Sequence, residues 1–68
     1  MKEVKIITEY IKLDQFLKYQ GIASTGGEAK FIISEGKVKV NGDIEYSRGR
    51  KLVPRDIIEY EKERFKIV

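Results

Sequence analysis

The dipeptide Asn41-Gly42 constrains the fold of this chain more than any other feature of its sequence. It follows Val38–Val40, where two valines alternate with lysine, and both of its residues tolerate the positive φ angles that a two-residue hairpin turn requires. The alternation predicts a strand at Val38–Val40 that pairs with roughly Ile44–Tyr46. We therefore expect a hairpin at the centre of the chain.

The first of two short helices is predicted to precede this hairpin. Leu13, Phe16 and Leu17 recur at the spacing of one helical face, with polar residues between them. Gly21 is placed to end the helix in a left-handed cap. The expected helix runs from about Leu13 to Gln20.

The second helix is predicted to begin at a capping box. Thr25 and Glu28 have the required spacing, so the Thr25 hydroxyl should accept a bond from a first-turn amide, and the Glu28 carboxylate should accept one from the Thr25 amide. Gly36 supplies the stop. The apolar stripe between these two ends consists of Ala29, Ile32 and Ile33.

Three more segments are predicted to be strands. Branched residues favour a strand at Glu3–Thr8, which we place at an edge of the sheet. Ile57–Tyr60 is a strand by its branched and aromatic content, and a turn over Leu52–Asp56 leads into it. Glu63–Val68 alternates again and closes the sheet.

The length allows one domain, residues 1–68, with one small core. We assign Phe16, Phe31 and Phe65 to that core. The predicted fold class is α+β, in which two short helices pack on a small, mainly antiparallel sheet. A fold of this size does not enclose a deep catalytic cleft between layers, so we expect a binding protein and not an enzyme.

The composition excludes several kinds of chemistry. The chain has no Cys and no His, which rules out disulfides, thiolate chemistry, imidazole acid–base catalysis and the usual zinc sites. No apolar run approaches the roughly 18 residues that span a bilayer, and the charged start lacks a signal-peptide core. We expect a cytoplasmic monomer with no cofactor, no metal and no membrane association.

The excess positive charge lies in the middle of the chain. The net charge is +3, and residues 30–55 alone carry four lysines and three arginines against three acids. Residues 1–29 are neutral overall, and residues 56–68 carry one net negative charge. A solubilising surface can have this distribution, but it is also typical of a protein that binds a polyanion.

A glycine-punctuated loop at Arg48–Lys51 carries three of these cations. Its arginines can make bidentate contacts with phosphate that a lysine cannot make. The alternative interpretation is a solvated loop whose charges only aid solubility. The residues alone leave both interpretations open.

The start of the second helix offers another contact, because Gly26 and Gly27 let a phosphate approach amides that no Cβ shields. Alternatively, Thr25 only caps the helix and the glycines only permit the preceding turn. We predict that this helix start and the basic loop form one face that binds structured RNA. The residues expected to contact RNA are Lys12, Lys18, Ser24, Thr25, Gly26, Gly27, Lys30, Lys37, Lys39, Arg48, Arg50 and Lys51.

Phosphate contacts would supply most of the affinity, with recognition of RNA shape, because the A-form major groove admits few side chains. Tyrosines could add stacking on unpaired bases. Tyr19 and Tyr46 are the candidates, since each lies beside a proposed contact element. For Tyr10 and Tyr60 we expect a buried ring with a solvated hydroxyl.

Between Lys12 and about Glu59, the order of these signals resembles the RNA-binding domain first described in small-subunit ribosomal protein S-four, also called the alpha-L motif. The matching segments are Lys12-Leu13-Asp14, Phe16-Leu17, Gly21-Ile22-Ala23-Ser24, Thr25, Glu28-Ala29-Lys30, Gly36-Lys37-Val38-Lys39-Val40-Asn41-Gly42 and Pro54-Arg55-Asp56. Thr-Gly-Gly and the later Arg-Gly-Arg-Lys-Leu are similar to the stand-alone, YaaA-like bacterial branch of this family. The resemblance implies ribosomal RNA or a ribosome assembly intermediate as the target, and it places the hairpin beside the second helix.

Two departures from the family pattern bear on mechanism. Gly26 stands where many members carry an arginine that reaches RNA, so a backbone contact would replace a side-chain contact there. Arg55 stands where the Pro-x-Asp turn usually has glycine.

Two other classes of function stay open. An enzyme could pair two of Asp14, Glu28 and Asp56 as general acid and base, although each carboxylate already has a structural use in a helix or a turn. A protein-docking module could use an exposed sheet edge at Val4–Thr8 or Glu63–Val68.

Overall fold

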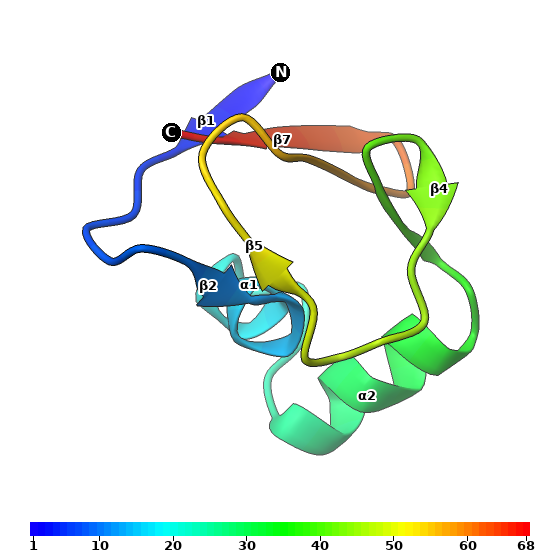
Figure 1. Ribbon diagram of the computed structural model, residues 1–68. Helices are drawn as coiled ribbons and strands as arrows, with labels where there is room; N and C mark the ends of the chain where they lie inside the picture. The colour runs from blue at the N-terminus through cyan, green and yellow to red at the C-terminus, as the bar shows by residue number, and fades with distance from the viewer.

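The structure, a computed structural model, describes residues 1–68 and contains a five-stranded sheet, a two-stranded ribbon and two helices. Figure 1 shows both helices on one side of the sheet, with the ribbon beside the first helix. The elements in chain order are β1 (Lys2–Val4), β2 (Ile11–Lys12), α1 (Leu13–Tyr19), α2 (Gly26–Ser34), β3 (Val38–Val40), β4 (Asp43–Ile44), β5 (Lys51–Leu52), β6 (Ile57–Tyr60) and β7 (Glu63–Ile67).

The sheet has the strand order β1-β7-β6-β3-β4, and β2 pairs with β5 in the separate ribbon. All strand pairs are antiparallel except β1 with β7. The predicted α+β class and the mainly antiparallel sheet are therefore confirmed. The ribbon was not predicted. Neither helix has the length and hydrophobicity of a membrane-spanning segment.

Both helices end as their sequence predicts. Gly21 follows α1 with a φ of +76°, and Gly36 follows α2 with a φ of +72°. At the start of α2, the Glu28 amide donates to the Thr25 hydroxyl over 3.0 Å. The returning bond differs from the prediction, because the Glu28 carboxylate accepts from the Ser24 amide, also at 3.0 Å, and not from the Thr25 amide. The Glu28 side chain thus reaches one residue further back than predicted, and the Ser24 hydroxyl donates to its second carboxylate oxygen.

The hairpin turn at Asn41-Gly42 is confirmed by φ angles of +53° and +91°. The predicted register was wrong by one residue. Val40 faces Asp43, and Lys39 faces Ile44, so β4 begins directly after the turn. A two-residue turn requires this register, since the residues that flank it must lie opposite each other.

The strands at the two ends of the chain lie side by side. β1 occupies an edge of the sheet, as predicted, but it spans only Lys2–Val4 of the expected segment. β7 pairs with β1 on one side and with β6 on the other. The docking edge predicted at Glu63–Val68 is therefore wrong, and the free edges of the sheet belong to β1 and β4.

The core is entirely apolar and lies between the helices and the inner face of the sheet. Phe16 of α1 meets Phe65 of β7 edge-to-face, with ring centroids 5.4 Å apart. The assignment of Phe31 to the core was wrong, because its side chain is 60% exposed. Its position on α2 lies outside the stripe formed by Ala29, Ile32 and Ile33, which are the buried residues of this helix.

Two turns far apart in sequence are bonded to each other. The Asn41 side chain donates to the Asp56 carboxylate over 3.0 Å and accepts from the Ile57 amide over 2.9 Å. Asp56 in turn closes the Val53–Asp56 turn, where its amide donates to the Val53 carbonyl over 3.0 Å. Asn41 thus has two structural roles, because its φ angle forms the hairpin turn and its side chain bonds that turn to the Val53–Asp56 turn.

The Val53–Asp56 turn holds Arg55 at a φ of +84°, where glycine is the favoured residue. Arg55→Gly should raise the free energy of unfolding by about 0.5–1 kcal/mol, because the relief of strain exceeds the entropy that glycine adds to the unfolded chain. Thermal unfolding followed by circular dichroism measures this as a rise of roughly 2–8 °C in Tm. Arg48→Gly is the matched control without a positive φ, and it should be neutral or slightly destabilising. An equal fall in Tm for both variants would contradict strain at Arg55.

Asn41→Ala should lower the free energy of unfolding by about 2–3 kcal/mol, because it removes two hydrogen bonds and leaves an unsuited residue at positive φ. Asn41→Gly loses the same bonds but keeps the permitted φ, so it should cost about 1 kcal/mol less. Urea denaturation of the two variants measures both contributions. Equal losses would show that the φ angle contributes nothing.

Candidate nucleic-acid interface

The start of α1 is held by the backbone of the basic loop, Arg48–Lys51. The first amides of a helix have no partner within the helix, and the N-cap residue Lys12 has no side-chain acceptor to offer them. The Leu13 amide instead donates to the Arg50 carbonyl over 2.8 Å, and the Asp14 amide donates to the Arg48 carbonyl over 3.0 Å. These two bonds fix the loop against the first turn of α1.

The ribbon continues this contact and brings two lysines face to face. Lys12 of β2 lies opposite Lys51 of β5. Hydrogen-bonded and non-hydrogen-bonded pairs alternate along an antiparallel ribbon, and the neighbouring pair, Leu13 with Arg50, is hydrogen-bonded. Lys12 and Lys51 are therefore a non-hydrogen-bonded pair, in which the Cα atoms are only about 4.5 Å apart and the side chains share one face. Like charges in this position repel each other.

Neither lysine has a carboxylate partner to offset that repulsion. The ion pairs of the protein join Arg50 to Glu45 and Arg64 to Glu59, and both lysines are exposed. The Lys51 ammonium lies over the Tyr10 ring, 4.8 Å from its centroid, which orients the ammonium without neutralising it. Arg48 is exposed and has no ion pair either. We call Lys12, Arg48 and Lys51 the cationic cluster.

Arg50 differs from its neighbours, because an internal carboxylate already binds it. Its guanidinium donates to Glu45 over 2.6 Å, and the second oxygen of Glu45 accepts from the Ser47 amide over 3.1 Å. Partial burial tends to raise the pKa of Glu45, but the Arg50 and Ser47 hydrogen bonds and the charge of Arg50 outweigh it, so this pKa lies below its ordinary value. The pair shapes the loop and partly neutralises Arg50.

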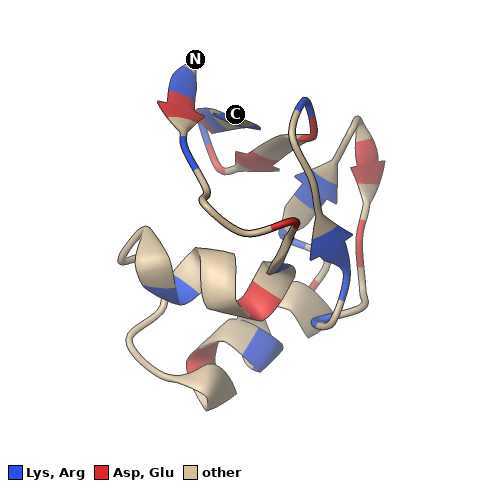
Figure 2. Ribbon diagram, turned by 60° about the vertical axis from the view of Figure 1, so that its left-hand side comes forward, with Lys and Arg blue, Asp and Glu red and all other residues tan.

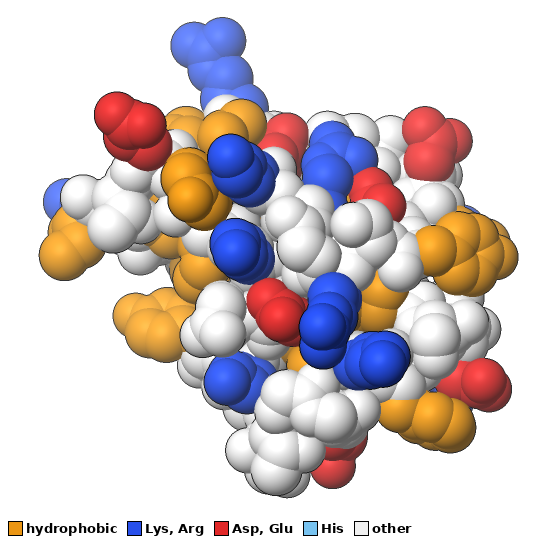
Figure 3. All heavy atoms as spheres, turned by 60° about the horizontal axis from the view of Figure 1, so that its bottom comes forward, with side chains coloured by type: hydrophobic (Ala, Val, Ile, Leu, Met, Phe, Trp, Pro, Cys, Tyr) orange, Lys and Arg blue, Asp and Glu red, His pale blue; other side chains and the backbone are white.

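Figure 3 views the molecule from the side of the helices and shows Lys and Arg side chains spread across the middle of this face, with carboxylates scattered among them. One acidic residue, Asp14, is held next to the cationic cluster, because its backbone amide donates a hydrogen bond to the Arg48 carbonyl. Its carboxylate accepts from the Gln15 amide over 2.8 Å and so is used in the first turn of α1.

The start of α2, the other half of the predicted face, is built differently. Gly26 and Gly27 are exposed, and their amides have no hydrogen-bond partner within the protein. The Glu28 carboxylate, however, already lies at this helix end on the amide and hydroxyl of Ser24. No hydrogen bond or ion pair links the helix start to the basic loop. Phosphate binding at Gly26 and Gly27 stays a prediction.

The remaining predicted lysines are distributed around the fold. Lys30 projects from the exposed side of α2, Lys18 lies in the last turn of α1, and Lys37 follows the end of α2. Lys39 lies on the outer face of the sheet, away from the helices, because its neighbours Val38 and Val40 face the core.

On the outer face of the sheet, positive side chains lie opposite negative ones. Lys39 lies opposite Glu59, and Glu59 lies opposite Arg64. The Nε atom of Arg64 is 3.5 Å from the Glu59 carboxylate. Figure 2 shows both signs of charge along these strands. This face therefore lacks the concentration of unpaired cations that marks the start of α1.

Sequence reasoning missed two residues of the site. Tyr10 was expected only to bury its ring, yet it supports Lys51. Glu45 was not considered at all, because an irregular loop gives no periodicity that would indicate which cation a carboxylate will meet.

The same fold and sequence pattern occur in known proteins. A family model described as S4 domain matches residues 4–68. The chain is 45% identical over 58 residues to the "Probable ribosome maturation protein RlbA" of Bacillus subtilis (strain 168), which covers 85% of this chain and 82% of that protein. It is 33% identical over 51 residues to the "Putative RNA-binding protein YbcJ" of Escherichia coli (strain K12), with coverages of 75% and 73%.

The solution structure of YbcJ from E. coli, described as revealing an alfaL motif involved in RNA-binding, matches with a TM-score of 0.72 and 28% identity. The match covers 100% of this chain and 87% of that one. The predicted resemblance to the alpha-L motif is thereby confirmed. Since the family model covers nearly the whole chain and one relative is 45% identical over 85% of it, the chain belongs to the S4 domain family.

Proposed function

We propose that this protein binds structured RNA through the cationic cluster, and that its target is ribosomal RNA or a ribosome assembly intermediate. The observation that carries the proposal is the pair of facing lysines, Lys12 and Lys51, which repel each other and have no acidic partner. A phosphate between them would relieve this repulsion.

The names of the relatives support the choice of ligand. One relative is called a probable ribosome maturation protein, and another is called a putative RNA-binding protein. A ribosomal target would place this protein in the cytoplasm. It would act there as a monomer, because the cationic cluster of a single copy can contact the RNA backbone. Backbone contacts of this kind recognise the shape of a folded RNA and not an extended base sequence.

We propose a binding role and not a catalytic one, because the acidic residues that could serve as acid and base are all in structural use. Asp14 accepts from the Gln15 amide, and Glu28 accepts from the Ser24 amide. Asp56 accepts from the Val53 amide and the Asn41 side chain. Each of the three belongs to a different cap or turn.

The double variant Lys12→Ala/Lys51→Ala should weaken binding to an RNA hairpin by about tenfold or more near physiological salt, because it removes two phosphate contacts. If the wild type engages about four or five phosphates, log affinity falls against log salt with a slope of roughly −3 to −4.5. The slope of the double variant should be shallower by about 1.5. Fluorescence anisotropy of a labelled hairpin over a range of salt concentrations measures both quantities.

Lys39→Ala/Lys66→Ala is the control with the same change of charge, placed on the outer face of the sheet, where Lys66 lies opposite Glu3. It should lower the affinity much less than the cluster variant. An equal loss in both variants would mean that net charge alone attracts the RNA. A flat salt response of the wild type would contradict phosphate binding altogether.

Glu45→Gln should strengthen RNA binding by about threefold to tenfold and steepen the salt slope by about 0.7–0.9, because it frees Arg50 for one more phosphate. Glu59→Gln is the matched control, since it breaks the Arg64 pair on the outer face and should leave RNA affinity nearly unchanged. Unchanged affinity in Glu45→Gln would remove Arg50 from the interface.

The same variant tests the electrostatics of the loop. The pKa of Glu45 is lower in the folded than in the unfolded protein, so its stabilising contribution is complete above its ordinary pKa and disappears as the pH falls through the lowered value. Wild type should exceed Glu45→Gln in free energy of unfolding by up to about 1 kcal/mol at neutral pH. Urea denaturation should show this difference vanish in strongly acidic solution. A difference that persisted there would contradict a charge-based contribution.

A further inference from the structure

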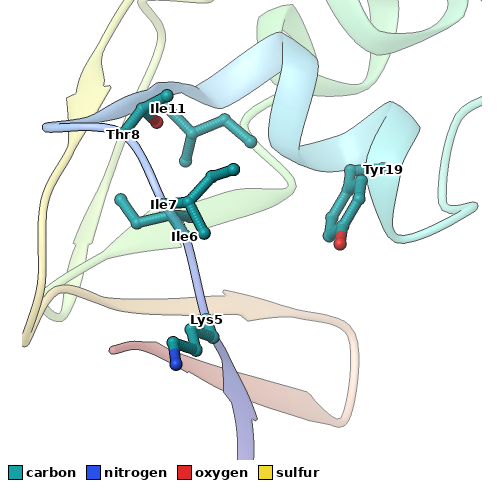
Figure 4. A pocket seen from close by; sticks show the side chains of 6 residues that line it. All are labelled: Lys5, Ile6, Ile7, Thr8, Ile11 and Tyr19. Atoms are coloured by element: carbon teal, nitrogen blue, oxygen red, sulfur yellow. The ribbon is translucent and has the colours of Figure 1, made fainter.

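A hollow of about 310 Å³ lies beside the cationic cluster and has no role in the interface described so far. It forms between the segment that follows β1 and the far end of α1, and it is lined by Lys5, Ile6, Ile7, Thr8, Ile11 and Tyr19. Figure 4 shows the Tyr19 ring on one side of the hollow and the segment that carries Ile6 and Ile7 on the other, with the two isoleucine side chains pointing in different directions.

The walls of the hollow expose apolar surface that folding leaves in contact with water. Ile7 is 96% exposed and Tyr19 is 70% exposed, and neither belongs to the core. The Tyr19 hydroxyl makes no hydrogen bond within the protein. A flat partner that covered the ring and the isoleucines would remove this surface from water.

We propose that the hollow receives one unpaired base of the bound RNA, with Tyr19 stacking on the base and Lys5 contacting an adjacent phosphate. This inference rests on the proposed RNA binding and adds to it a site for a single base. The volume of about 310 Å³ leaves room for a base, and aromatic rings are the side chains on which bases stack without sequence preference.

The position of the hollow makes one continuous RNA contact possible. Ile11 lines the hollow, and the next residue is Lys12 of the cationic cluster. Lys12 precedes the first residue of α1 and Tyr19 is its last, so the length of this helix, about 10 Å, separates them and neighbouring nucleotides can reach both.

The charges around the hollow favour a nucleotide over an apolar segment of another protein. No acidic residue lines it, while Lys5 does. Lys18 is exposed next to Tyr19 on α1, and Lys12 is exposed at the other end of that helix. The mostly apolar lining thus includes one cation, and two more lysines are the sequence neighbours of lining residues, as expected for a site that takes a base together with its phosphates.

The test compares two RNA hairpins that differ in one nucleotide, a single unpaired adenosine in one and an abasic residue at the same position in the other. Wild type should bind the first hairpin at least about fivefold more tightly, because only that hairpin offers a base to stack. Tyr19→Ala should bind both hairpins equally, with the affinity of wild type for the abasic RNA. Tyr19→Phe should keep the preference, since the ring and not the hydroxyl makes the contact.

Phe31→Ala is the control, because Phe31 is 60% exposed but does not line the hollow. It should keep the full preference for the unpaired adenosine. Stacking at position 19 can be measured directly with the variant Tyr19→Trp, which introduces the only tryptophan of the chain. Its fluorescence should be quenched by the adenosine hairpin and not by the abasic one.

The outcomes separate this inference from the function on which it rests. Equal, salt-dependent binding of both hairpins by wild type and Tyr19→Ala alike, without tryptophan quenching, would overturn the base site and leave RNA binding standing. That result would also be expected if the hollow served a protein partner. Absence of salt-dependent binding to either hairpin would overturn the proposed function itself.

Discussion

The candidate interface depends on two amides at the start of α1 that need hydrogen-bond acceptors. The side chain of Lys12 cannot supply one, so the carbonyls of Arg48 and Arg50 do, and the loop that carries them is drawn onto the helix. The same contact extends into the ribbon, which sets Lys12 opposite Lys51. Satisfying the backbone at a helix end thus gathers the cations, and the charge pattern follows from hydrogen bonding.

The elements with strong local signals could be predicted from the sequence. The glycines at positions 21 and 36 and the turn at Asn41-Gly42 adopt the positive φ angles expected of them, and the helix ends and the hairpin follow. The β2–β5 ribbon could not be predicted, because strands of two residues show no alternation and pair across a long stretch of sequence. Phe31 was misplaced because an apolar residue was equated with a buried one.

The candidate site was predictable in composition but not in arrangement. The sequence indicated the cations of the loop and of Lys12, yet it did not show which would be neutralised within the protein. Glu45 binds Arg50, while Lys39 lies on another face beside Glu59. Such pairings depend on tertiary geometry, which brings charges together without regard to their distance along the chain. The hollow at Tyr19 is likewise a product of tertiary packing between distant segments.

The parallel pairing of β1 with β7 has a consequence for folding during synthesis. β1 is synthesised before β7, which is its only neighbour in the sheet, so the β1 backbone stays unpaired until β7 has also left the ribosome. Its short length and its charged Lys2 and Glu3 make it a poor template for association with other nascent chains during that delay.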